Sequence, residues 1–102
     1  ALNSDASVRI LKGEERPINN EKDRASIIAA LDVVDLVVIF REQTPIIPIE
    51  LICPEILVKG GDWKVEEIVG GEFVQEHGGK VYAIPFQEGY SSSNLIEKIK
   101  KL

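Results

Sequence analysis

Short runs of β-branched and other apolar residues alternate with helix-forming segments along this 102-residue chain. The clearest run is Asp-Leu-Val-Val-Ile-Phe at 35–40, and similar runs occupy 56–58 and 81–84. A near-continuous apolar strand is typical of a parallel sheet buried on both faces. The alternation therefore predicts an α/β fold built on parallel strands, with each strand followed by at least one helix.

Capping residues and glycines locate the expected helices. The segment 3–5 is suited to cap the first helix, and Thr44 is expected to cap the third with Pro45 in its first turn, although Pro48 conflicts with that assignment. The expected helices are 6–11, a stretch after Asn20, a stretch after Thr44, 72–77 and a stretch after Ser93. With the first two residues taken as the end of a strand, the order is strand, helix, helix, strand, helix, strand, helix, strand, helix.

Four polar loops follow the expected strands. In an open parallel sheet, ligands bind beyond the carboxyl ends of the strands. The loops that this rule selects are 3–5, 40–42, 59–63 and 87–93. Polar residues and glycines concentrate in them, which is a physical reason to expect a binding site there.

The loop Lys59-Gly60-Gly61-Asp62-Trp63 carries several chemical groups suited to a nucleotide. Paired glycines let the backbone approach a ligand closely or adopt positive φ. The lysine can meet a phosphate, the carboxylate can accept hydrogen bonds from a sugar or base, and the indole offers a stacking face. The alternative is a tight turn that carries a partly exposed tryptophan.

Ser91, Ser92 and Ser93 open the last expected helix. Free N–H groups and the positive end of the helix dipole favour an anion at this position, and hydroxyl groups would add donors. The alternative is that one serine caps the helix and the others are merely small.

Arg24 lies on the apolar side of the second helix, four residues before Ile28 and seven before Leu31. A charge at that position needs a partner. That partner is either a ligand phosphate or an internal acid such as Asp35. Lys12, taken alone, reads as a solvated lysine in the loop after the first helix.

Charge and composition argue against several classes of function. The net charge is −5, and the only basic cluster lies at the C-terminal end, so we expect no nucleic-acid partner. No apolar run is long enough to cross a membrane and no leader is visible, so we expect a cytoplasmic protein. His77 and Cys53 are single, which argues against a metal site; we expect the histidine at a helix end and the cysteine buried.

Several segments together resemble the cytidylyltransferase-like, or nucleotidyltransferase, domain of ADP-heptose synthase. The segments that carry this resemblance are 1–8, 11–13, 16–19, 23–24, 58–63, 66–70 and 88–93. They occur in the family's order over essentially the whole chain. The resemblance implies a Rossmann-like parallel sheet with helices on both faces.

The resemblance also implies an activity. The family member would be D-glycero-β-D-manno-heptose 1-phosphate adenylyltransferase, which makes ADP-heptose and pyrophosphate from ATP and a sugar phosphate for the lipopolysaccharide core, with Mg²⁺ assisting. Lys12 and Arg24 would be the catalytic residues that face phosphate groups. The residues implied to bind the nucleotide are Asn3, Lys59, Gly60, Gly61, Asp62, Ser91, Ser92 and Ser93.

The chain departs from the family pattern at one essential motif. The family has two histidines spaced His-x-Gly-His after its first strand, and nothing here matches them. The resemblance therefore implies that residues 1–102 are the C-terminal two-thirds of a single nucleotidyltransferase domain that lacks its first strand and helix. Because the first strand is central in the family's sheet, we expect a gap in the sheet and no activity from this stretch alone.

The same resemblance suggests partners and alternatives. Relatives in the superfamily form dimers, and many carry a fused sugar kinase domain, so we expect both arrangements. The alternatives are an enzyme like glycerol-phosphate cytidylyltransferase, which shares the later motifs, and a non-catalytic nucleotide-binding fragment.

Overall fold

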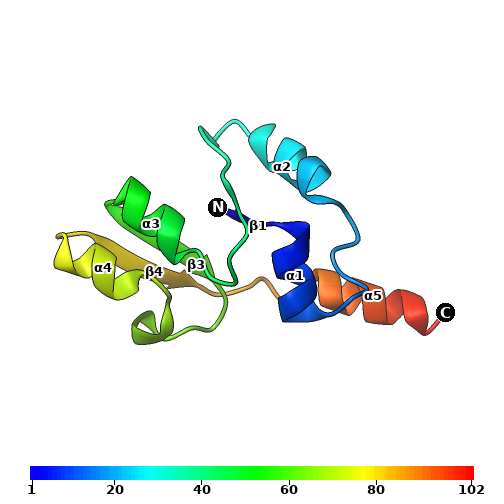
Figure 1. The fold of residues 1–102 in the computed structure, drawn as a ribbon. Coiled ribbons are helices and arrows are strands. Elements are labelled where there is room, and N and C mark those ends of the chain that lie inside the picture. Colours follow the sequence, from blue (N-terminus) through cyan, green and yellow to red (C-terminus); the bar gives the residue numbers. More distant parts are fainter. The chain divides into compact units, whose positions relative to one another are not determined.

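The computed structural model describes all 102 residues and divides them into two compact units, 1–53 and 54–102 (Figure 1). Five α-helices and four β-strands follow one another in the order that the sequence predicts, with a short 3₁₀ helix, η1, added at Val65–Glu67. Both strand pairs are parallel. The α/β class expected from the alternating pattern is confirmed.

The first unit contains two short strands and three helices. These are β1 (Leu2–Asn3), α1 (Asp5–Lys12), α2 (Glu21–Ala29), β2 (Ile39–Phe40) and α3 (Ile46–Ile52). Strands β1 and β2 pair in parallel, with Leu2 opposite Ile39 and Asn3 opposite Phe40. The expected caps form where expected: Ser4 Oγ accepts the Ser7 N–H and Asn20 Oδ1 accepts the Asp23 N–H.

A buried serine holds the polar part of this unit together. Ser7 is fully buried on α1, and its hydroxyl donates to the backbone oxygen of Glu42 at 2.8 Å. The Ser7 hydroxyl oxygen in turn accepts a hydrogen bond from the Asn3 side-chain amide at 2.9 Å. Because both bonds are satisfied away from water, they tie the end of β1 and helix α1 to the loop after β2.

The second unit is built on a longer strand pair. Its elements are β3 (Ile56–Gly60), η1, α4 (Gly71–Glu76), β4 (Lys80–Ile84) and α5 (Ser92–Lys100). Strands β3 and β4 run in parallel from Ile56 opposite Lys80 to Gly60 opposite Ile84. Helix α4 packs beside this pair (Figure 1), and Ile68, Val74 and Val81 form the buried core.

Glycine is required where α4 meets the strands. A Cβ atom at Gly79 would lie 2.6 Å from Val74 Cγ1 and 2.7 Å from the backbone oxygen of Glu55. That same oxygen accepts the N–H of Lys80 at 2.8 Å. The close approach of helix and strand therefore depends on the missing side chain at position 79.

The extent and burial of the strands differ from the sequence expectation. The apolar run 35–40 forms a strand only at Ile39–Phe40, because β1 offers only two residues with which to pair. Leu36 is 71% exposed, and Ile56 and Val58 on β3 are each more than half exposed. The expectation that these runs are buried on both faces is wrong for this structure.

The third helix and Cys53 also differ from what the sequence predicts. Pro45 occupies the cap position of α3 and no side chain caps the helix, so Thr44 does not have the expected role. Pro48 is the third helical residue, where its missing N–H would have had no intrahelical partner, which explains why it does not break the helix. Cys53 is exposed rather than buried, and closes α3 with a left-handed φ of 50°.

The strands form two separate two-stranded sheets, β1 with β2 and β3 with β4. No hydrogen-bonded strand joins the two pairs. None of the helices has the length and apolar character needed to cross a membrane.

Candidate functional site

The carboxyl ends of β1 and β2 bring two of the four expected loops together. The strands are parallel, so the segments 3–5 and 40–42 leave the same edge of the sheet. The N–H of Ser4 donates to the backbone oxygen of Phe40 at 2.8 Å, just beyond the paired residues. The first unit therefore carries a polar edge of the kind that binds ligands in parallel sheets.

Arg24 is held at this edge by three hydrogen bonds. Its Nη2 donates to Asp5 Oδ1 and to the backbone oxygen of Asn3, both at 2.9 Å. Its Nε donates to the backbone oxygen of Asn19 at 3.0 Å. In this structure the charged partner of Arg24 is an internal acid, and that acid is Asp5 rather than Asp35.

Asp5 is the charged partner of that arginine in the first turn of α1. Desolvation by itself would raise the pKa of Asp5. The hydrogen bond from Arg24, a backbone hydrogen bond from Glu21 and the charges of Arg24 and Arg9 outweigh that effect, and the pKa lies below its ordinary value of 3.8. In return, the N–H of Asp5 donates to Glu21 Oε1 at 3.1 Å. The carboxylate therefore stays ionised and links α1 to α2.

The other two candidates of the first unit have different surroundings. Asn3 is half-buried, and its amide nitrogen and backbone oxygen are engaged by Ser7 and Arg24. Lys12 is the last residue of α1 and is exposed, rather than lying in the loop that follows. The structure thus brings Asn3 and Arg24 together and leaves Lys12 at the other end of α1.

The motif 59–63 lies at the carboxyl edge of the β3–β4 pair. Lys59 and Gly60 end β3, and the N–H of Gly61 extends the pairing by donating to the backbone oxygen of Ile84 at 2.8 Å. Gly61 is buried with φ of +120°, a conformation that L residues rarely adopt. Lys59 Nζ lies 5.0 Å from the ring centroid of Trp63, within the range of a cation–π contact.

Two aromatic rings, rather than open space, lie against the glycine pair. A Cβ atom at Gly61 would lie 3.0 Å from Trp63 Cδ1 and Nε1 and 3.3 Å from Phe86 Cε2. A Cβ atom at Gly60 would lie 3.0 Å from Phe86 Cε1. Phe86 is not among the residues that the sequence motifs indicate. Its position two residues beyond β4 was the available signal, because that places it at the same edge of the sheet.

The serine cluster begins the last helix as expected. Ser91 is the cap residue of α5, and its hydroxyl accepts the N–H of Asn94 at 3.0 Å. Ser92 and Ser93 are the first two helical residues and are exposed. One serine therefore has the purely structural role that was the alternative, while the next two remain accessible at the helix N-terminus.

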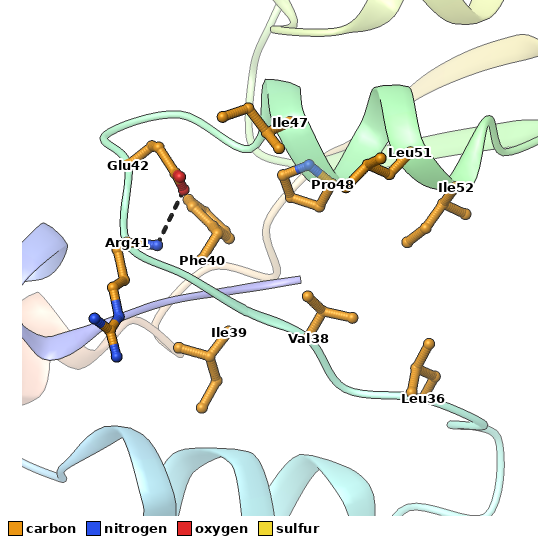
Figure 2. A pocket seen from close by; sticks show the side chains of 10 residues that line it. All are labelled: Leu36, Val38, Ile39, Phe40, Arg41, Glu42, Ile47, Pro48, Leu51 and Ile52. Carbon is orange, nitrogen blue, oxygen red and sulfur yellow. Dashed lines mark hydrogen bonds between the residues drawn. The ribbon is translucent and has the colours of Figure 1, made fainter.

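A groove of about 400 Å³ lies beside α3 in the first unit (Figure 2). Figure 2 shows α3 on one side of it and the chain leading into β2 on the other. The lining is mainly apolar: Leu36, Val38, Ile39, Phe40, Ile47, Pro48, Leu51 and Ile52, with Arg41 and Glu42. The groove therefore shares the loop 40–42 with the polar edge, but Asn3, Lys12 and Arg24 do not line it.

No metal site is formed by the chain's own side chains. Nowhere do three His, Cys, Asp or Glu residues converge in a way that could hold an ion. His77 ends α4, where its Nδ1 lies 2.8 Å from the backbone oxygen of Phe73 and its ring packs on the Phe73 ring. It thus has the helix-end position that the sequence predicts.

Comparison with known proteins identifies relatives over almost the whole chain. No family model matches it. It is 57% identical over 99 residues to the bifunctional protein HldE of Geotalea uraniireducens, and 52% identical over 100 residues to the proteins of that name from Rhodopseudomonas palustris and Helicobacter pylori. These alignments cover 97–98% of the chain but only 20–21% of each relative. The chain is therefore homologous to a segment, about one-fifth in length, of the bifunctional protein HldE, in agreement with its resemblance to the ADP-heptose synthase domain.

Proposed function

We propose that this chain is part of an adenylyltransferase that converts ATP and D-glycero-β-D-manno-heptose 1-phosphate into ADP-heptose and pyrophosphate for the lipopolysaccharide core. The observation that carries the proposal is identity of 52–57% to HldE proteins over nearly every residue of the chain. A sugar-phosphate oxygen attacks the α-phosphorus of ATP and forms a new P–O bond. The bond to the bridging oxygen breaks, and pyrophosphate leaves with the electron pair.

In this reaction the protein positions the two substrates and supplies positive charge, and it forms no covalent intermediate. Lys12 and Lys59 are exposed cations that can meet phosphate oxygens. Ser92 and Ser93 lie at the N-terminus of α5, where the positive end of the helix dipole favours an anion. We assign Arg24 a positioning role, because its three donated bonds hold the end of β1 and the start of α1.

We propose further that residues 1–102 are the C-terminal two-thirds of one nucleotidyltransferase domain. Two-stranded sheets are marginal by themselves, and a third strand between the pairs would complete a parallel sheet. The groove beside α3 and the half-exposed apolar side chains of β3 and β4 would be covered by the rest of the domain. The His-x-Gly-His motif would lie in that part, so this stretch alone is expected to be inactive.

The relatives are bifunctional proteins, which supports a second catalytic domain, and we propose that this domain is a fused sugar kinase. We also propose a homodimer and a cytoplasmic location, as in the family that the sequence resembles. We also propose that magnesium assists the reaction, arriving with ATP and held mainly by phosphate oxygens.

The test is a transfer assay on the intact gene product, with its mass and N-terminal sequence determined first. The protein is incubated with heptose 1-phosphate and either ATP or CTP, and the products are resolved by ion-exchange chromatography. We expect ADP-heptose from ATP and little product from CTP. Transfer of CMP to glycerol phosphate would instead identify the cytidylyltransferase alternative, and binding without any transfer would identify a non-catalytic fragment.

A further inference from the structure

Two exposed aromatic side chains lie at the carboxyl edge of the β3–β4 pair. Phe86, on the connection after β4, is 74% exposed, and Trp63, after β3, is 43% exposed. The Phe86 ring lies beside Gly60 and Gly61, and the Trp63 ring lies beside Gly61, at the distances given above. Large apolar rings that stay accessible beside polar groups favour a binding surface over a packing role.

The glycines are what allow the two rings to lie there. A side chain at Gly61 would meet both rings, and one at Gly60 would meet Phe86. The glycine pair therefore leaves room for the aromatic rings. The sequence had suggested a different role, in which the glycine backbone would approach a ligand closely. Lys59 adds a positive charge 5.0 Å from the Trp63 ring centroid.

We propose that Phe86 and Trp63 form a stacking platform for the adenine ring of the bound nucleotide; this inference rests on the proposed function and names the residues that take the base. A planar base covers an exposed aromatic ring efficiently, and such stacking tolerates a flat, open surface. The exposed carboxylate of Asp62 lies on the same loop and can accept a hydrogen bond from an exocyclic amino group. Lys59 supplies a positive charge beside the platform that can attract the phosphates of the nucleotide.

The test is a fluorescence titration of the chain, in which Trp63 is the sole tryptophan. ATP is added to the wild-type chain and to the variants Phe86→Leu, Phe86→Tyr and Tyr82→Leu. Tyr82 is the matched control, because it is a 47% exposed aromatic residue on β4 that lies outside the candidate loops. Inorganic tripolyphosphate, which carries the charge of ATP without a base, is the control ligand.

We expect saturable quenching of Trp63 by ATP and none by tripolyphosphate. Phe86→Leu should weaken ATP binding by about 5- to 150-fold, the range for losing one base–aromatic stack. Phe86→Tyr keeps an aromatic face and should remain within about twofold of the wild type, as should Tyr82→Leu.

Three results would overturn the platform: no saturable quenching by ATP, equal quenching by tripolyphosphate, or unchanged affinity in Phe86→Leu. The transfer assay on the intact gene product separates this inference from the proposed function. Adenylyl transfer without a Phe86 effect refutes the platform alone. Stacking without transfer supports the platform and refutes the proposed reaction.

Discussion

Replacing Gly61 with alanine should disturb the candidate site through both backbone and side-chain effects. The residue has φ of +120°, where a Cβ atom strains the backbone by about 1–3 kcal/mol. The smaller conformational entropy of an unfolded alanine offsets about 0.4–1 kcal/mol of that. The added Cβ would also lie 3.0 Å from the Trp63 ring and 3.3 Å from Phe86. Because both rings are exposed, we expect them to move outward rather than to block folding.

We therefore expect Gly61→Ala to lose about 1–2 kcal/mol of unfolding free energy. Stability is measured by urea unfolding followed by far-UV circular dichroism, and the ring position by the emission maximum of Trp63. Gly78→Ala is the matched control, because Gly78 has φ of +82° and nothing within 4 Å of its added Cβ. That variant should lose stability without shifting the emission.

The reasoning would be refuted by a Gly61→Ala variant that unfolds at the wild-type urea concentration and keeps the wild-type emission maximum. A shift in emission of the same size in Gly78→Ala would also refute it. In that case the change would report general loosening of the second unit rather than displacement of Trp63.

Three further perturbations test the framework around the site. Gly79→Ala should lower the free energy of unfolding by about 1–3 kcal/mol, since its Cβ would overlap Val74 and the Glu55 backbone; unchanged urea unfolding would contradict this. Asn20→Ala removes the cap of α2 and should cost about 1 kcal/mol, with faster amide exchange at Asp23 as its local sign; unaltered exchange there would argue against the cap. Asp5→Asn tests linkage: the folded pKa is depressed, so the carboxylate stabilises the fold above its unfolded pKa, and this contribution is lost as pH falls through the folded value. The wild type should therefore exceed Asp5→Asn in urea midpoint at pH 7 and lose that advantage below pH 3.8; a constant difference would refute the assignment.

Local chemistry accounts for what could be predicted from the sequence. The order of helices and strands follows from short-range patterns, and Ser91 caps its helix through a contact three residues away. The resemblance to ADP-heptose synthase could also be recognised from the order of the motifs, and the HldE relatives confirm it. Such features need no knowledge of which distant segments meet.

Contacts between segments that are distant in the sequence determine the side-chain partners and the strand lengths. Arg24 binds Asp5, which is 19 residues away, and the helical pattern could not distinguish this acid from Asp35. Phe86 reaches the glycine pair only because β3 and β4 run side by side in register. An apolar run such as 35–40 indicates that burial is favourable. How much of the run forms a strand depends on the length of β1, the strand with which it pairs. The sequence by itself therefore determines the order of helices and strands and the relationship to HldE proteins. The partner of each charged side chain and the position of each aromatic ring depend on tertiary packing, because these interactions join groups that lie far apart along the chain.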